Sequence, residues 1–182
     1  MLNTNLKFTY EDYVLMPEGK RYEIVEGELY MVPAPTTTHQ RISRKLEEML
    51  SRFVEERKLG EVFDAPIDVV FSETDIVQPD IIFISNENKN IIKEENIKGA
   101  PDLIIEILSP SSAQRDKTIK KKLYAKNGVK EYWLVETQKR TIEALVLGKR
   151  GYETFKVFSD KEVLTTRLIK GLQIPVEQLF EK

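Results

Sequence analysis

The sequence predicts one α/β or α+β domain built on a central mixed β-sheet flanked by helices. Its 182 residues match the length of about one typical domain, and no internal repeat or long linker divides them. Segments with strand-like alternation interleave with segments of helical periodicity, which is typical of a sheet covered by helices. Two apolar segments, 81–84 and 103–108, are nearly continuous, as in strands buried on both faces. We therefore treat residues 1–182 as a single domain.

The first half of the chain predicts a hairpin, a long helix and three strands. Residues 21–32 alternate around Glu26-Gly27, a pair that suits a tight turn. After two prolines, the threonines of 36–38 are candidate helix caps, and Gly60 is the stop signal. Apolar residues follow helical spacing between them: Ile42, Leu46, Met49, Leu50, Phe53 and Val54. Segments 61–71, 81–84 and 103–108 are then predicted as strands.

The second half predicts a lysine-rich helix followed by more strands. Residues 109–112 (SPSS) form a break rich in capping residues before a helix over 113–126, which Asn127-Gly128 closes. Segments 131–136 and 141–147 predict a second hairpin, and 152–158 predicts one more strand. The last fifteen or so residues are expected to form a strand and a short terminal helix.

Composition excludes several classes of protein. Cysteine is absent, so disulfides, thiolate nucleophiles and cysteine-bound metals are excluded, and His39 is the only histidine, so a zinc site built on several histidines is excluded too. No apolar run reaches the ~18 residues of a membrane span, and residues 1–20 lack the apolar core of a signal peptide. We expect a cytoplasmic protein without a membrane segment. The net charge of −2 indicates no overall basic field.

Glu106 is the residue that fits its surroundings least. It lies inside the apolar segment 103–108, where a lone buried carboxylate costs several kcal/mol unless it is paired or bound to a metal. An ion pair with a lysine or arginine of a covering helix, or a position that reaches water at the strand end, is the structural explanation. A metal site is the functional one. No nucleotide-binding glycine motif, P-loop or serine-hydrolase elbow competes with it.

Asp80 is the aspartate best placed to share an ion with Glu106. Asp102 lies on the same predicted strand as Glu106, about 13 Å away at ~3.3 Å per residue, which is too far. Asp80 opens a different strand, and neighbouring strands lie only about 4.8 Å apart. Two such carboxylates with water and substrate phosphate suit Mg²⁺. A turn residue after a proline is the alternative for both aspartates.

The lysine-rich helix contributes a third element. Asp116, Lys120 and Tyr124 recur at a spacing of four residues and so share one helix face. A solvated lysine run explains Lys120 equally well, and packing against the sheet explains Tyr124. The cations in and after this helix could also bind DNA phosphates, or could simply form a solvated face. These cations are Arg115, Lys117, Lys120, Lys121, Lys122, Lys126 and Lys130.

Six short motifs, in this order, make the sequence similar to the Uma2 family. This family is also called the DUF820 group of restriction-endonuclease-like proteins, within the PD-(D/E)xK nuclease superfamily. The motifs are RYEIVEGEL at 21–29, PAP at 33–35 with His39, QPDI at 78–81, GAPDLIIEILSPS at 99–111, D-x3-K-x3-Y at 116–124 and GVKEYW at 128–133. The resemblance covers roughly residues 10–180.

The resemblance implies a restriction-endonuclease-like core with Asp80 and Glu106 as the motif carboxylates. The lysine expected two residues after Glu106 is replaced by Leu108, so Lys120 is the candidate for its role. Glu23 matches an early family glutamate and becomes a possible further metal ligand, or else a charged edge-strand residue. His39 matches a family histidine, with helix capping or partial burial as the alternative. Supporting or phosphate-contacting roles are expected for three residues: His39, Asp116 and Tyr124.

The function that follows is a metal-dependent endonuclease acting on DNA. Mg²⁺ or Mn²⁺ is the expected cofactor, and a homodimer is expected if both strands of a duplex are cut. Exposed edge strands, with Tyr132 and Trp133 near a hairpin, favour a dimer. The alternative is a catalytically inactive nuclease fold that serves as a nucleic-acid-binding or protein-interaction module. Hydrolysis of another phosphoester is a third possibility, because a fold does not fix a function.

Overall fold

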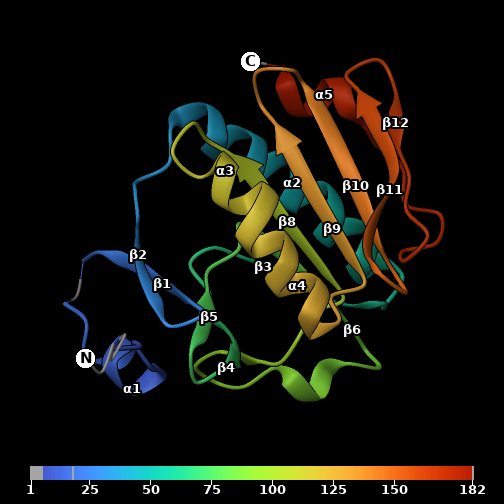
Figure 1. Cartoon of the computed structure of the whole chain (residues 1–182). Helices are drawn as coiled ribbons and strands as arrows, with labels where there is room; N and C mark the ends of the chain where they lie inside the picture. The colour runs from blue at the N-terminus through green and yellow to red at the C-terminus, as the bar shows by residue number, and fades with distance from the viewer. Residues whose placement is uncertain (1–5, 18, 182) are drawn as a thin grey trace.

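The computed structural model is a mixed α+β fold in which mixed sheets are flanked by helices, as the sequence predicts (Figure 1). It describes residues 6–17 and 19–181. The described strands form three sheets. Two are larger, with six and five strands, and the third is a two-stranded sheet formed by β12 (Val163–Leu164) and β13 (Ile174–Pro175). Of the described helices, none is long and apolar enough to cross a membrane.

The six-stranded sheet has the order β11-β10-β9-β8-β6-β3. Strands β8 and β9 run parallel, and the other neighbours are antiparallel. In the register of β6 with β8, Ile81 lies opposite Ile105, so Asp80, just before β6, comes level with Glu106 in β8. The strand bounds are β3 (Gly60–Asp64), β6 (Ile81–Ser85), β8 (Leu103–Leu108), β9 (Glu131–Glu136), β10 (Thr141–Gly148) and β11 (Gly151–Ser159).

The five-stranded sheet has the order β2-β1-β5-β4-β7 and carries the predicted N-terminal hairpin. The two turn residues, Glu26 and Gly27, have φ of 54° and 82°, as a type I′ turn requires. This hairpin matters for the site because it brings Glu23 of the inner strand next to the six-stranded sheet. The bounds are β1 (Arg21–Val25), β2 (Glu28–Val32), β4 (Val69–Ser72), β5 (Asp75–Val77) and β7 (Ile97–Lys98).

Helices cover both faces of the six-stranded sheet. The long helix α2 (Thr37–Glu56) buries Ile42, Leu46 and Leu50 against one face, where Trp133 also packs. The lysine-rich helix is continuous in three parts, α3 (Ala113–Arg115), the π-helical turn η2 (Asp116–Lys120) and α4 (Lys121–Asn127), and covers the other face. Three shorter elements complete the described chain: α1 (Tyr10–Val14), η1 (Lys89–Ile91) and α5 (Val176–Phe180).

Most predicted elements are confirmed, and one is wrong. The predicted strand 61–71 is two strands, β3 and β4, that belong to different sheets. Pro66 lies between them, and a proline cannot donate a ladder hydrogen bond, which favours a break at this point. Strands β5 and β7 are only three and two residues long and were not predicted from the sequence.

The aromatic pair offered in support of a dimer does not lie on the surface. Tyr132 and Trp133 are both fully buried, and the Tyr132 hydroxyl donates to the backbone carbonyl of Asp116 at 3.2 Å. Their positions follow from β9, which is covered on both faces by helices and so buries alternate side chains in two cores. These residues therefore give no support to a dimer.

Candidate active site

Glu106 is paired with a lysine, as a buried carboxylate requires. Its Oε1 lies 2.9 Å from Nζ of Lys120 and accepts a hydrogen bond from the Tyr124 hydroxyl at 2.7 Å. Glu106 is 4% exposed and Lys120 3%. Tyr124 also packs edge-on against Tyr132, so it both fills the core and holds the carboxylate. The strand β8 and the helix over it thus meet through a buried ion pair.

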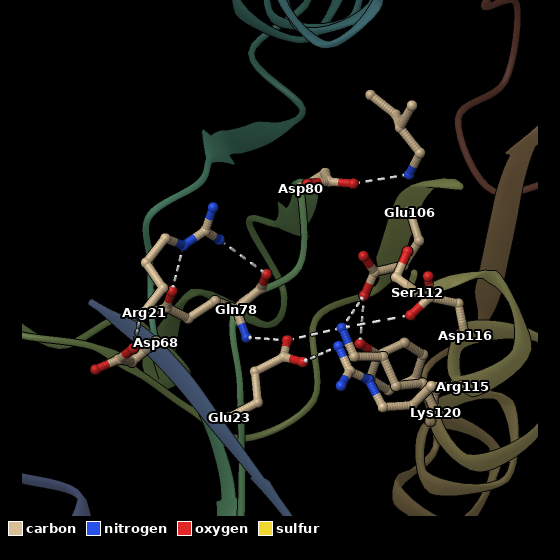
Figure 2. Close-up of polar contacts among 12 residues, drawn as sticks. Arg21, Glu23, Asp68, Gln78, Asp80, Glu106, Ser112, Arg115, Asp116 and Lys120 are labelled. Carbon is tan, nitrogen blue, oxygen red and sulfur yellow. Dashed lines mark hydrogen bonds and ion pairs between the residues drawn. The ribbon is translucent and has the colours of Figure 1, made fainter. Parts of the chain in front are cut away.

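Glu23 approaches the same lysine from β1. Its Oε1 lies 2.7 Å from Nζ of Lys120 and accepts from the backbone N–H of Gln78 at 3.0 Å, and its Oε2 lies 3.4 Å from Arg115. Glu23 is 1% exposed. Figure 2 shows Glu23 and Glu106 pointing toward Lys120 from two different strands. The five-stranded sheet is therefore tied to the helix through Lys120.

Asp116 completes the group of carboxylates around Lys120. It belongs to the π-helical turn, and its Oδ1 lies 3.7 Å from Nζ of Lys120. This oxygen is buried and has no hydrogen-bond partner among the described residues. Asp116, Lys120 and Tyr124 therefore share one helix face, as their spacing predicts, and π-helical turns are often found at functional sites.

Asp80 lies at the open side of the group, at the entrance to β6. Its Oδ2 accepts from the backbone N–H of Ile107 at 2.7 Å and lies 3.0 Å from Nε2 of His39 (Figure 2 shows the first of these contacts). His39 stands in the first turn of α2, where its N–H is capped by the Thr36 side chain at 3.2 Å. Two of the predicted site residues, His39 and Asp80, are therefore in direct contact.

A pocket of about 210 Å³ opens beside these residues. Its walls come from the segment before α2, the end of β8 with the loop 109–112, and the start of the lysine-rich helix. Glu23 is not among the described residues that line it. Five of the predicted site residues do line it: His39, Asp80, Glu106, Asp116 and Lys120.

The charges at this site shift the pKa values of its members. Burial raises the pKa of Glu106 well above its ordinary range, Lys120 opposes this, and the nearby Asp116, Asp80 and Glu23 raise it further. Burial likewise raises the pKa of Asp116, again against the effect of Lys120.

The pKa of Lys120 moves up as well. Burial by itself would lower it, but the carboxylates of Glu106, Glu23 and Asp116 outweigh burial and raise it. The surrounding carboxylates therefore favour the charged form of Lys120.

The donor set suits a hard divalent cation at the pocket. The site holds four carboxyl groups, those of Glu23, Asp80, Glu106 and Asp116, against two basic side chains, those of Lys120 and Arg115. Asp80 and Glu106 use one oxygen each in the contacts given above. No group of three or more potential ligand side chains is preformed within 6–17 and 19–181. A site of two carboxylates and several waters is the arrangement that Mg²⁺ accepts.

Sequence reasoning missed the residues that hold Glu23. Gln78 donates to Glu23 through its backbone, and Arg21 donates to the Gln78 side chain at 2.7 Å. Arg115 lies over the ring of Tyr30, 4.8 Å from its centroid, while it pairs with Glu23. Arg21 and Gln78 do stand in the matched motifs at 21–29 and 78–81, whereas Arg115 carries no local signal.

The lysine-rich surface is less free than the sequence suggests. Lys120 is buried, Lys117 pairs with Glu136 at 2.8 Å, and Lys130 pairs with Asp102 at 2.6 Å. Asp102 also accepts a hydrogen bond from the backbone N–H of Ser85 at 2.8 Å, so it links the end of β6 to the start of β8. It lies outside the group around Lys120, as its spacing from Glu106 predicts.

Known proteins share the fold of this chain. No curated protein matches the chain. Among solved structures, the chain is similar to one described as a putative nuclease belonging to DUF820 from Anabaena variabilis ATCC 29413. The two share 22% identity with a TM-score of 0.79 over 94% of this chain and 97% of the other, which shows a common fold. The model of the Uma2 family, described as putative restriction endonuclease, matches residues 10–177. The chain therefore belongs to the Uma2 family.

Proposed function

We propose that this protein is a metal-dependent endonuclease that hydrolyses phosphodiester bonds of DNA. One observation carries the proposal. Asp80, just before β6, and Glu106, in the neighbouring strand β8, line the same pocket as Lys120, a buried lysine whose ammonium lies 2.9 Å from Glu106. Membership of a nuclease-like family supports it. We place its activity in the cytoplasm, in keeping with a chain that contains no cysteine.

Asp80 and Glu106 would hold one Mg²⁺ or Mn²⁺ ion. When bound, such an ion polarises a phosphoryl oxygen and lowers the pKa of a bound water. His39 holds Asp80 through Nε2, and the backbone of Ile107 holds the same oxygen, so the carboxylate is fixed before substrate arrives. As a metal ligand, Glu23 stays a prediction from the family resemblance. Its contacts favour another role, which is to position Lys120.

Lys120 would stabilise negative charge as it develops on the phosphate. A compact ammonium whose pKa is raised by its neighbours stays charged through the reaction. Glu23 and Asp116 fix its position from two sides, and Tyr124 fixes the carboxylate of Glu106. Because its neighbours raise the pKa of Lys120, this lysine is favoured as a charge-stabilising group over a proton acceptor.

The test is cleavage of supercoiled plasmid by purified protein. We expect nicked or linear DNA with Mg²⁺ or Mn²⁺, none with EDTA, and at least a 100-fold loss of rate in Glu106→Gln purified in the same way. Asp102→Asn is the matched control, since it also neutralises a buried strand carboxylate but lies outside the pocket. Cleavage that is equal in wild type and Glu106→Gln, or absent from wild type, contradicts the proposal and leaves a binding module or hydrolysis of a different phosphoester as the function.

Cleavage of both strands of a duplex calls for two active sites, so we propose a homodimer. Sedimentation equilibrium of the purified protein is expected to give twice the mass of the chain. A monomer at all concentrations, with or without duplex DNA, would contradict this part of the proposal.

A further inference from the structure

A second pocket adjoins the candidate active site on the side of α2. Its volume is about 340 Å³, and His39 and Asp80 line both pockets. The contact of 3.0 Å between Nε2 of His39 and Oδ2 of Asp80 is thus the boundary between them. A long ligand that reaches Glu106 in the first pocket can continue past this boundary into the second.

The second pocket carries two free guanidinium groups. Arg41 and Arg44 line it, stand about one turn apart on α2, and are both exposed. Within the described chain, neither forms an ion pair or a side-chain hydrogen bond. Arginine presents a rigid fork of donors that matches phosphate oxygens. These side chains are therefore available to bind an anionic ligand that crosses the boundary.

The lysines of α4 are less well placed for the same task. The first pocket is lined by Asp116 and Lys120 of η2 and by no residue of α4, and the exposed lysines of α4, Lys122 and Lys126, line neither pocket. Lys122 and Lys126 lie two and six residues beyond Lys120, about 3 and 9 Å along the axis at ~1.5 Å per residue. Figure 1 shows that α2 and α3 begin at the same end of the six-stranded sheet. The pocket that holds the two arginines adjoins the candidate active site near this beginning of α2.

We propose that a DNA strand runs from the active site over α2, with Arg41 and Arg44 binding the phosphates next to the scissile one. This inference rests on the proposed function, which it deepens by assigning the path of the substrate. These two arginines are contacts to the phosphate backbone, so they set affinity and orientation and carry no sequence preference.

A carboxylate of the second pocket, that of Asp64, gives the proposal a test of opposite sign. Glu47 and Asp64 line it with the arginines, and Glu47 accepts a hydrogen bond from Ser51 at 2.8 Å. Asp64 is exposed at the end of β3 and repels a phosphate that passes there. Its neutralisation should therefore strengthen binding of the strand.

The experiment measures binding of a fluorescent single-stranded DNA oligonucleotide in EDTA by fluorescence anisotropy over a range of salt concentrations. We expect Arg41→Gln/Arg44→Gln to weaken binding more than tenfold and to reduce the slope of log affinity against log salt by about 1.4, at ~0.7 for each phosphate contact in single strands. Asp64→Asn should bind severalfold more tightly than wild type. Lys122→Gln/Lys126→Gln is the matched control, because it removes two exposed cations from a helix and should change the slope little.

Each result decides the inference. Equal losses in the two double variants, a larger loss in the lysine variant, or no binding by wild type would overturn it. Thermal unfolding of every variant shows that binding changes do not arise from loss of the fold. If the arginine variant loses binding but wild type does not cleave plasmid, the proposed endonuclease is contradicted and the DNA path over α2 stands. If wild type cleaves plasmid with metal but the arginine variant binds DNA as wild type does, the endonuclease stands and the path is contradicted.

Discussion

Lys120 is the residue on which the candidate site depends most. Its ammonium lies within 2.9 Å of both Glu23 and Glu106, and all three side chains are almost completely buried. Removing one partner of a buried ion pair leaves the other charge without compensation, which costs far more than the pair contributes in itself. This contrast makes the lysine testable by stability as well as by activity.

We expect Lys120→Met to lower the free energy of unfolding by about 3–5 kcal/mol at pH 7. The reason is that Glu106 remains buried without a cation, while Glu23 keeps only Arg115, at 3.4 Å. Lys120→Met/Glu106→Gln should recover part of this loss, because it removes the buried carboxylate that has lost its cation. Urea unfolding of the three proteins measures the effect, and a loss of under about 1 kcal/mol in the single variant would show that the group is not held by this lysine.

Activity should depend on pH through Glu106. Because burial, with the nearby Asp116, raises the pKa of Glu106 above its ordinary 4.5, a proton competes with the cation at pH values where an exposed glutamate is already ionised. We expect kcat/KM to rise with pH with a midpoint above 4.5. Lys120 should add no fall below pH 10.5, because its pKa is raised.

Asp116→Asn is the variant that checks the cause of this profile. It removes a negative neighbour that raises the pKa of Glu106, so the midpoint should move to lower pH. Two results would show that Glu106 does not control the profile. One is a wild-type midpoint at or below 4.5, the ordinary pKa of glutamate, and the other is a midpoint that moves to higher pH in Asp116→Asn.

Strand joints and the lysine-rich helix fix where the site residues stand. The start of β8 is held by Asp102, which bonds to the N–H of Ser85 at the end of β6 and to Lys130 before β9. The π-helical turn then sets the positions of Asp116 and Lys120 over the same sheet. The two motif carboxylates come together because β6 and β8 are neighbours in register.

Asp102→Asn should weaken this joint without touching the pocket. Burial alone would raise the pKa of Asp102, but Lys130 and Ser85 outweigh it and lower the pKa below 3.8. A lowered pKa contributes stability above pH 3.8, and this contribution is lost as the pH falls further. We expect the variant to lose about 1–3 kcal/mol at pH 7. The loss should shrink below pH 3.8, as urea unfolding at several pH values would show, and a loss independent of pH would contradict this account.

Local sequence could predict the elements and half of the site. Glu106 stands out because it is a charge in an apolar strand, and its neighbour Asp80 follows from the spacing of strands. Lys120 does not stand out from Lys121 and Lys122, because only the packing of the helix decides which lysine is buried. The resemblance to Uma2 singled it out.

Long-range contacts could not be predicted in this way. Arg115 meets Glu23 across 92 positions of sequence, through a hairpin docked on a different sheet. The split of 61–71 into strands of two sheets also depends on that docking, and a short strand such as β5 is too brief to show a pattern. The contacts of Glu23 therefore depend on how the two sheets pack together, whereas the positions of Asp80 and Glu106 depend only on the pairing of β6 with β8.

The central claim is that Asp80 and Glu106 hold one divalent cation beside Lys120. A titration of Mn²⁺, with free Mn²⁺ followed by electron paramagnetic resonance, tests it without any need for substrate. We predict that wild type binds one Mn²⁺, that Asp80→Asn and Glu106→Gln each bind it at least tenfold more weakly, and that Asp102→Asn binds it like wild type. No bound Mn²⁺ in wild type, or unchanged affinity in both pocket variants, would contradict the claim.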